Sequence, residues 1–351
     1  MNVDYIVVGI GLAGISFCEQ LRAHNKTFIV FDNQSQRSSV VAGGLYNPVV
    51  LKRFTPVWKS EEQLLLVTSI YGNLEKRLQV KLDYKIPVYR KFASLEEQND
   101  WFAASDRPQL TKYLSTSLIK NANKAVNAPY GFGEVKHTGR IAVKKMVKAC
   151  KQELLQEERL IESEFDHNML NVSNAIITYK HIKAKHVVFT EGYNMSKNPF
   201  FKGLPLLPTK GELLTIHAPD LNIDYVLKGS VFLIPLKRDK YLVGATYGWG
   251  DTSNTISEEA KVELLNKLKT LINCPFQVVD QMAGVRPTVK DRRPLVGRHA
   301  THGNLYVLNG LGTRGVMIAP YVAKQLFEYI EFNAPLDKDI DIKRFGNTVL
   351  R

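Results

Sequence analysis

Cysteine is scarce in this chain of 351 residues, and the placement of its few cysteines excludes two kinds of protein. The three cysteines, Cys18, Cys150 and Cys274, are isolated, odd in number and form no Cys-x-x-Cys pair. We therefore expect neither a disulfide framework nor a zinc site. The eight histidines show no His-x-x-x-His spacing, so the sequence predicts no metal centre.

Long hydrophobic runs are also lacking. No apolar stretch approaches the roughly 20 residues that a helix needs to cross a bilayer, so no membrane span is expected. The apolar N-terminal stretch carries Asp4 and no basic region, which argues against a signal peptide. Hydrophobic residues still make up 44% of the chain, which allows a large core, and the length suggests two domains. We expect a cytoplasmic protein.

Negative charge is outweighed by positive charge. The chain has 47 Lys plus Arg against 34 Asp plus Glu, a net charge of +13. This excess fits an anionic partner such as RNA, or a basic surface that guides a carboxylate substrate to its site. The basic residues are spread along the chain and no RNA-binding module is recognisable. The second interpretation is therefore favoured, and nucleic acid is kept as the alternative.

The first 32 residues carry the strongest motif. Residues 5–8 are apolar and β-branched, which predicts a buried strand. Gly9, Gly11 and Gly14 follow in the G-x-G-x-x-G spacing. In this motif the first glycine allows a tight turn, the second lets a pyrophosphate approach the backbone, and the third lets a helix lie close to the strand.

Two further elements complete a nucleotide-binding unit. A helix at residues 15–24 would direct its free N–H groups and positive dipole end at phosphates. A second strand at residues 27–31 ends in Asp32, whose carboxylate is placed to accept hydrogen bonds from an adenosine ribose. An acid here disfavours a 2′-phosphate. The motif therefore predicts FAD or NAD rather than NADP, without deciding between the two.

The remaining chain alternates helical and strand patterns, which predicts an α/β protein. Helices are predicted at residues 60–78, 94–102, 139–157 and 257–271. Strands are predicted at residues 84–92, as a pair within 168–179, and at 182–190, 210–216, 231–235 and 241–246. The last three strands suggest an antiparallel sheet, and residues 82–133 suggest a second domain inserted into the nucleotide fold.

Small residues recur in two later loops. Ala42, Gly43 and Gly44 would let backbone N–H groups pack close to a ligand. Near the C-terminus, a strand at residues 305–308 leads into the glycine-rich loop 310–315 and then into a helix through Ile330. This repeats the opening order of strand, glycine loop and helix N-terminus, so it can hold a second electron-rich group.

Together these motifs resemble the D-amino-acid oxidase and glycine oxidase (DAO) family of flavoproteins over nearly the whole chain. The resemblance also uses Pro235, the segment 243–246, Gly284-x-Arg286-Pro287 and Pro294-x-x-Gly297. It implies a Rossmann-like FAD-binding domain of the DAO/glutathione-reductase type at residues 1–78, 136–203 and 284–351. The inserted substrate domain, with a mixed and largely antiparallel sheet, is then expected at residues 79–135 and 204–283.

The resemblance implies FAD rather than NAD. No cysteine lies where sarcosine oxidases attach the flavin, so FAD is expected to be non-covalent. The helix that begins at Gly315 is expected to direct its N-terminus at the flavin pyrimidine carbonyl, with amides of Gly312 and Thr313 beside it. The full set of expected FAD contacts is Gly9, Gly11, Leu12, Ala13, Gly14, Asp32, Asn33, Ala42, Gly43, Gly44, Leu45, Gly192, Arg286, Gly310, Gly312, Thr313, Arg314, Gly315 and Val316.

The substrate implied by the resemblance is an amine, usually an α-amino acid, with oxygen or a quinone as the electron acceptor. Arg286 matches the family arginine that clamps the substrate carboxylate, and it presents the Cα–H to flavin N5 for hydride transfer. The imine product is hydrolysed by water. From the residues alone, a salt bridge between Arg286 and Asp291 or another acid is the alternative.

Several residues depart from the family pattern or could add to the site. Phe232 stands where glycine oxidases place a tyrosine, and Tyr247 either compensates for it or fills space. The loop Thr190-Glu191-Gly192-Tyr193 brings a carboxylate near the cofactor region. His299 could touch the cofactor. Lys52 and Arg53 could meet phosphate or substrate, or could belong to the charged surface.

Three function classes follow. The first is a flavin amine or amino-acid oxidase or dehydrogenase. The second is a tRNA-modifying FAD enzyme that acts on an aminoacid-like group of a modified base, which fits the net charge, the loop 44–48 and the adjacent Lys52 and Arg53. The third is a flavin-bound module without catalysis, for which no amine would bleach the flavin.

Overall fold

Strand β1 (Asn2–Val8) lies inside an eight-stranded sheet, between β2 (Phe28–Phe31) and β13 (Ile182–Phe189), and runs parallel to both. The sheet belongs to a computed structural model that describes residues 1–173 and 176–346. Its remaining strands are β10 (Leu160–Ile161), β11 (Leu170–Val172), β12 (Ile177–Tyr179), β20 (Leu295–Arg298) and β21 (Leu305–Asn309). Because β13 also pairs in parallel with β21, it occupies the central position that its apolar sequence predicts.

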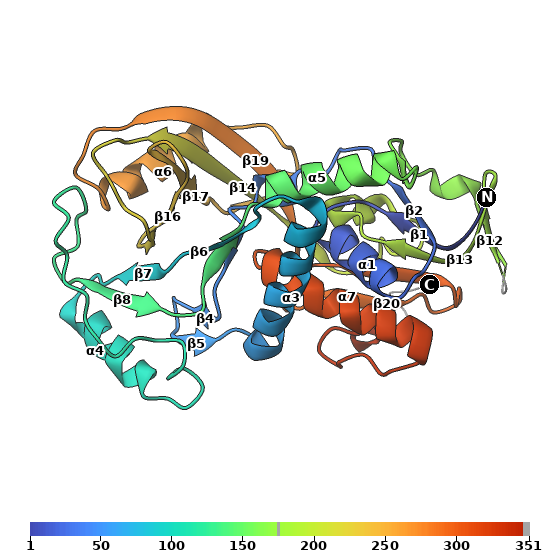
Figure 1. Cartoon of the computed structure of the whole chain (residues 1–351), viewed down its shortest axis with the longest axis horizontal. Helices are drawn as coiled ribbons and strands as arrows, with labels where there is room; N and C mark the ends of the chain where they lie inside the picture. Colours follow the sequence, from blue (N-terminus) through green and yellow to red (C-terminus); the bar gives the residue numbers. More distant parts are fainter. Residues whose placement is uncertain (174–175, 347–351) are drawn as a thin grey trace.

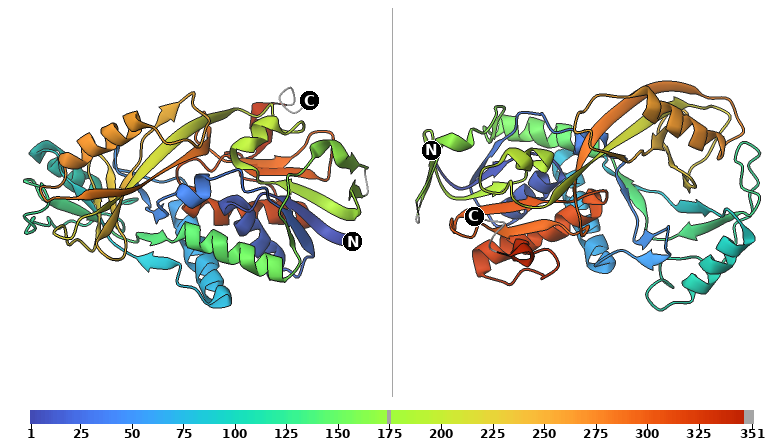
Figure 2. Two further views of the ribbon diagram at one scale, coloured as in Figure 1. Left: turned by 90° about the horizontal axis from the view of Figure 1, so that it is seen from above. Right: turned by 180° about the vertical axis from the view of Figure 1, so that it is seen from behind.

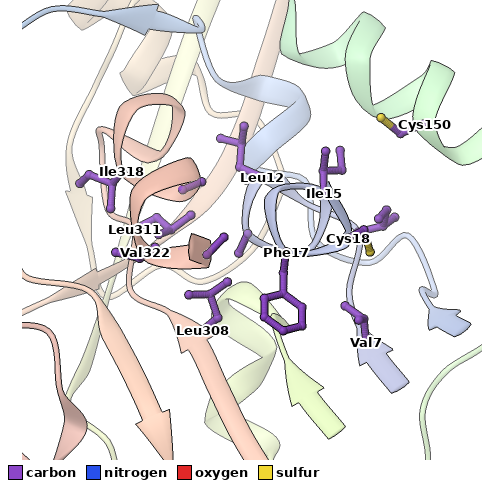
Figure 3. Packing of buried hydrophobic residues seen from close by; sticks show 14 of the residues in the cluster. Val7, Leu12, Ile15, Phe17, Cys18, Cys150, Leu308, Leu311, Ile318 and Val322 are labelled. Atoms are coloured by element: carbon purple, nitrogen blue, oxygen red, sulfur yellow. The ribbon is translucent and has the colours of Figure 1, made fainter. Parts of the chain in front are cut away.

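Helices cover this first sheet, as Figure 1 shows on the side of the N-terminus. They are α1 (Leu12–Ala23), α3 (Ser60–Leu78), α5 (Val143–Gln156) and α7 (Gly315–Phe332). Figure 3 shows the core between them, where Phe17 of α1 and Leu308 of β21 point toward one another. Both side chains are fully buried, so the helices that follow the two glycine loops are fixed by one apolar cluster.

A second eight-stranded sheet forms the opposite end of the elongated molecule (Figure 2). Its strand order is β18-β14-β17-β16-β15-β7-β8, and β19 pairs with the other edge of β14. The bounds are β7 (Val88–Lys91), β8 (Phe132–Val135), β14 (Leu206–His217), β15 (Val226–Lys228), β16 (Phe232–Pro235), β17 (Lys240–Gly244), β18 (Gly248–Trp249) and β19 (Gln277–Val289). Only the β7–β15 pair is parallel, so the expected antiparallel arrangement is confirmed.

Short elements connect the two large sheets. A three-stranded sheet joins β3 (Leu45–Tyr46), β9 (Gly139–Ile141) and β6 (Asp83–Lys85), and β4 (Val49–Val50) pairs with β5 (Thr55–Pro56). The remaining helices are α2 (Ser38–Val41), α4 (Leu95–Ser105) and α6 (Glu258–Lys269), with 3-10 turns at His167–Met169, Gly192–Lys197 and Ile342–Phe345. No helix within the described ranges is long and apolar enough to span a bilayer.

Several element predictions are confirmed and two are wrong. The helix at Ser60–Leu78 has the predicted bounds. The helix predicted at residues 139–157 instead begins at Val143, because Gly139–Ile141 extends as a strand between β3 and β6. The single strand predicted at residues 84–92 is divided at Pro87 into β6 and β7, which belong to different sheets.

The two large sheets separate largely as the predicted domains would. The first sheet uses strands from residues 1–78, 136–203 and 284–351, of which residues 347–351 lie outside the described chain. Residues 174–175, inside the predicted strand pair, also lie outside it. Strand β19 crosses the predicted boundary at residue 284. The α/β fold with an antiparallel second sheet is confirmed, and the boundaries themselves remain a prediction.

Candidate functional site

A cavity of about 690 Å³ lies between the two large sheets. Pockets of this size hold cofactors and small ligands in many proteins. Its walls come from the end of β1, the start of α1, the loop after β2, one face of the second sheet and the segment that enters α7. All predicted FAD contacts line it except Gly14 and Gly310, and Phe232 and Tyr247 line it as well.

Gly14 and Gly310 shape the cavity from behind. A Cβ on Gly14 would lie 2.0 Å from the Gly9 carbonyl oxygen, so only glycine lets α1 approach the end of β1 this closely. Gly310 has a φ of +71°, and its Cβ would meet Val289 at 2.7 Å. The close packing of α1 against β1 at Gly14 agrees with the role predicted for this glycine. Neither Gly14 nor Gly310 lines the cavity, so their predicted contacts with FAD stay a prediction.

Two helix N-termini open into the cavity, those of α1 and α7. Gly11 precedes α1, and its side toward the cavity meets only the Ser39 hydroxyl, which accepts a hydrogen bond from the Leu12 amide at 3.1 Å. Gly312 precedes α7 with a φ of +57° and no atom closer than 4.0 Å to a built Cβ. Residues at both N-termini line the cavity, and each N-terminus is a positive helix end, which fits two electron-rich groups of one extended ligand.

Asp32 stands at the tip of β2, as predicted, but not as a free acid. Its carboxylate forms an ion pair with the ammonium of Lys151, which comes from α5. Both side chains line the cavity. The Asp32 carboxylate keeps further lone pairs for a ribose hydroxyl. The ammonium of Lys151 balances its negative charge. Sequence reasoning missed Lys151, because it is far from Asp32 in the chain.

The small residues at 42–44 are required by the protein's own packing. Gly44 has a φ of +79°, and its Cβ would lie 2.0 Å from the carbonyl oxygen of Ile141. A Cβ on Gly43 would lie 3.0 Å from Ile234. The two glycines line the cavity, but their lack of side chains lets the second sheet and β9 approach, rather than serving a ligand alone.

Arg286 projects from the middle of β19 into the cavity. Its Nη1 donates a hydrogen bond to the carbonyl of Thr246 at 3.3 Å, and its guanidinium lies 4.9 Å from the ring centroid of Tyr247. Burial lowers the pKa of Arg286. Asp291 instead pairs with Arg344 at 2.8 Å, so the alternative of an Arg286–Asp291 bridge is wrong.

Gly211 supports Arg286 and was missed by the sequence analysis. It lies on β14 opposite Gly284, and a Cβ there would come within 1.9 Å of Nη2 of Arg286. The guanidinium therefore rests flat against the bare backbone of β14. This position depends on the register of β14 and β19, which the sequence alone does not reveal.

A second buried arginine faces the same cavity. Arg314 Nη1 donates to the carbonyl of Asn47 at 3.0 Å, and burial lowers the pKa of its guanidinium. The Gly312 amide, expected to face the cofactor, donates instead to the Pro287 carbonyl at 3.1 Å. Of the expected donors at this helix end, Thr313 and Gly315 are left to face the cavity.

Lys228 is a third cation in the cavity wall, and it too was missed. It ends β15, donates to the carbonyl of Gly229 at 2.8 Å, and places its ammonium 4.6 Å from the ring centroid of Phe232. Burial, followed by the positive charges of Arg90 and Lys267, lowers the pKa of Lys228 to about 8. Across the described residues, no carboxylate forms a salt bridge with Lys228, Arg286 or Arg314.

Other candidate residues have structural partners. Glu191, 8% exposed, binds His167 at 3.0 Å and accepts a hydrogen bond from Asn198 at 2.7 Å, so its carboxylate is engaged within the protein. His299 packs against Phe201 away from the cavity, contrary to the suggested cofactor contact. Lys52 lies at the cavity rim, whereas Arg53 does not line it.

Comparison with known proteins places this geometry in a family. The profile of the DAO family, described as FAD dependent oxidoreductase, matches residues 4–329. The chain belongs to this family. FAD is therefore its cofactor, as the resemblance implied, and the chain is an oxidoreductase.

The DAO family relatives divide into two groups. Over 163 residues the chain is 31% identical to glycine oxidase of Bacillus subtilis, covering 44% of this chain and 43% of that enzyme. Over 400 residues it is 22% identical to the tRNA 5-methylaminomethyl-2-thiouridine biosynthesis bifunctional protein MnmC of Shewanella amazonensis, covering 96% of this chain and 58% of that protein. The chain thus spans less than two thirds of the curated relatives it matches.

Solved structures share the DAO fold. Glycine oxidase from Geobacillus kaustophilus superposes with a TM-score of 0.77 at 18% identity, covering 98% of both chains. L-proline dehydrogenase from P. horikoshii gives a TM-score of 0.79 at 15% identity, covering 100% of this chain and 99% of that one. Identities this low establish the shared fold alone.

The cavity of this DAO family member fits FAD on three observations. The N-termini of α1 and α7 both open into it, Asp32 stands where a ribose hydroxyl would bind, and the volume suits a large ligand. The α1 end would hold the pyrophosphate, and Thr313 and Gly315 would hold the flavin carbonyl. When bound, FAD supplies a two-electron acceptor at flavin N5.

The cysteines lie apart from this cavity. Cys18 and Cys150 are buried between α1 and α5 (Figure 3), and burial raises the pKa of the Cys150 thiol to about 12. Cys274 does not line the cavity either. A protonated thiol is a poor nucleophile, which supports the prediction of non-covalent FAD.

Proposed function

We propose that this protein oxidises an amine that carries a carboxylate, an amino acid in the simplest case. The observation that carries the proposal is Arg286. It is a half-buried guanidinium that faces the FAD cavity, is held by the Thr246 carbonyl and the Tyr247 ring, and pairs with no carboxylate of the described residues. An uncompensated buried cation favours an anionic ligand. The planar fork of arginine matches a carboxylate in a bidentate pair.

The chain's own residues then orient the substrate. Arg286 would hold the carboxylate and so orient the carbon that bears the amine, FAD would supply the hydride acceptor, and water would hydrolyse the resulting imine. Tyr247 would cover the guanidinium at the mouth, and Phe232 adds an apolar side chain to the wall of the same cavity. A substrate that binds as the free amine needs no protein base.

A direct test is anaerobic bleaching of the bound flavin. The holoenzyme is mixed with D- and L-amino acids and with N-methyl glycines, and flavin absorbance is followed. Arg286→Ala should reduce kcat/KM for carboxylate substrates by about 30- to 1,000-fold, since a paired charge is worth about 2–4 kcal/mol at such a site. The matched control is Arg298→Ala, which removes an exposed arginine outside the cavity. Unchanged bleaching in Arg286→Ala would contradict the proposal.

A second candidate function is oxidation of an aminoacid-like group on a modified tRNA base. Three observations favour it: the net charge of +13, the cluster of uncompensated cations in the cavity, and the match of the MnmC relative over 96% of this chain. Binding of total tRNA should then weaken steeply with salt, because released counterions drive association with phosphates. Salt-independent binding, or no bleaching by tRNA, would exclude this candidate.

The electron acceptor is the remaining part of the proposal. Oxygen or a quinone accepts the electrons from the reduced flavin. Oxygen consumption by the holoenzyme with its substrate, compared with reduction of a soluble quinone under argon, separates an oxidase from a dehydrogenase. Failure of both acceptors would show that neither reoxidises this flavin.

A further inference from the structure

Lys228 belongs to the wall of the cavity that faces the substrate region. In the register of the second sheet it pairs with Phe232 on β16, and Phe232 pairs with Gly244 on β17. All three residues line the cavity, as does Leu213, which pairs with Gly244 from β14. One row of neighbouring residues thus forms this wall, and Lys228 ends the row.

Two cations, Arg90 and Lys267, lie near Lys228, and each is paired with a carboxylate of its own. Arg90 of β7 pairs with Lys228 in register and is engaged by Glu97. Lys267 of α6 lies near and is engaged by Glu263. The ammonium of Lys228 itself contacts only the Gly229 carbonyl and the Phe232 ring. Burying an ammonium without an anionic partner is costly, so this position favours an anion.

The distance across the sheet shows that this anion is not the group held by Arg286. The strands that carry Arg286 and Lys228 are separated by the path β19-β14-β17-β16-β15, which is four strand steps. At about 4.8 Å per step, their backbones lie roughly 19 Å apart along the sheet. The guanidinium rests over Gly211 of β14 and the ammonium lies over the Phe232 ring of β16, so the two cations are separated by two strand steps, or roughly 10 Å. A single carboxylate cannot engage both cations at this separation.

We propose that Lys228 binds a second anionic group of the substrate, at the end of the cavity away from Arg286. The substrate would then be an amino acid or N-substituted glycine extended by an arm that ends in a phosphate or another acid. A nucleotide phosphate and the acid of a long free amino acid share this chemistry. The inference rests on the proposed function, because it assumes that Arg286 holds the reacting end.

The test uses a molecular ruler. Amino acids with a terminal phosphonate on chains of increasing length are titrated into the oxidised holoenzyme, and the change in the visible flavin spectrum gives Kd without turnover. The wild type should bind the longer compounds at least tenfold more tightly than the shortest. Lys228→Met should lose this preference, and Lys228→Arg should keep most of it. Lys267→Met, which removes a neighbouring charge outside the cavity, should bind like the wild type.

Turnover adds a second readout that distinguishes the two sources of the anion. With sarcosine, which has a single carboxylate, Lys228→Met should keep kcat/KM within about twofold of the wild type. With total tRNA as the substrate, KM should rise about tenfold in Lys228→Met while kcat is kept, and this result identifies a nucleotide phosphate. If KM rises in Lys228→Met for the long phosphonates and not for tRNA, the anion is the terminal acid of a free amino acid.

Two results would overturn the inference. One is equal binding of the long phosphonates to the wild type and Lys228→Met. The other is a loss of kcat/KM for sarcosine in Lys228→Met as large as the loss for the long substrates, which would place Lys228 at the reacting amine. If no compound bleaches the flavin, the proposed function fails, yet the spectral titrations still report whether Lys228 binds an anion.

Discussion

The substitution Gly211→Ala tests the Arg286 clamp without removing the arginine. A Cβ at this position would lie 1.9 Å from Nη2 of Arg286, whereas ordinary contact begins at 3.4 Å. The guanidinium must therefore move by about 1.5 Å, which is the difference between the two distances. The clash falls on the flexible end of a side chain, so the fold should lose about 1 kcal/mol, the low end of what overpacking costs.

The displaced guanidinium should no longer hold both oxygens of a carboxylate. Losing one charge-assisted hydrogen bond costs about 1.5–3 kcal/mol, which corresponds to a decrease of about 10- to 100-fold in kcat/KM. A misplacement of about 1 Å has effects of this size in other enzymes. The assay is steady-state oxidation of the best amino-acid substrate, with flavin content and the urea midpoint measured on the same preparation.

Gly248→Ala is the matched control, because it lies in the same sheet and its nearest neighbour to a built Cβ is 3.7 Å away. It should leave both stability and kcat/KM unchanged. The reasoning is refuted if Gly211→Ala keeps wild-type kcat/KM with a full complement of flavin. It is equally refuted if Gly211→Ala loses its flavin or unfolds, since the clash would then not be confined to Arg286.

Three further predictions concern the cofactor and stability. Gly14→Ala places a Cβ 2.0 Å from the backbone oxygen of Gly9, where nothing can yield, so we expect a loss of about 1–3 kcal/mol or more in urea unfolding and a low flavin-to-protein ratio. Acid precipitation should release the flavin into the supernatant, and flavin in the pellet would mean covalent attachment. Lys228→Met should be more stable than the wild type at pH 7, because it removes an uncompensated buried charge. The pKa of Lys228 falls from 10.5 to about 8 on folding, so the unfolded chain holds the extra proton between these values. Wild-type stability therefore rises with pH across this window, and the stability difference between Lys228→Met and the wild type becomes smaller. A difference in melting temperature that stays constant with pH would contradict the lowered pKa of Lys228.

The cofactor half of the site could be predicted from sequence because its determinants are local. Gly9, Gly11 and Gly14 act within one strand–turn–helix unit, and the segment before α7 repeats that unit. Helix α3 was predicted with its bounds, since its apolar residues keep one helical period over the whole length. Where two patterns adjoin, as at residues 139–143, apolar residues of a strand and a helix merge and the sequence does not show the boundary.

The substrate half could not be predicted as fully, because it depends on pairings between distant strands. Gly211 meets Arg286 only through the register of β14 with β19, and Lys228 joins the wall only through β16 and β17. Lys151 reaches Asp32 from a helix more than a hundred residues later. Arg286 was identified through its motif. That Asp291 does not pair with Arg286 depends on the position of Arg344, which holds Asp291 instead.

The charges of the cavity divide by position, and the division bears on what the enzyme accepts. At the predicted adenosine end, Asp32 forms an ion pair with Lys151, and Glu191 is hydrogen-bonded to His167 and Asn198. Along the second sheet, Arg286 and Lys228 are held by carbonyl oxygens and aromatic rings. Carbonyl groups leave the positive charge uncompensated, so an anionic substrate gains affinity by relieving that burial as well as by its own hydrogen bonds. An amine of the same shape without an acidic group obtains neither contribution to its affinity. Selectivity for amines that carry an acid therefore follows from the unpaired cations of the protein.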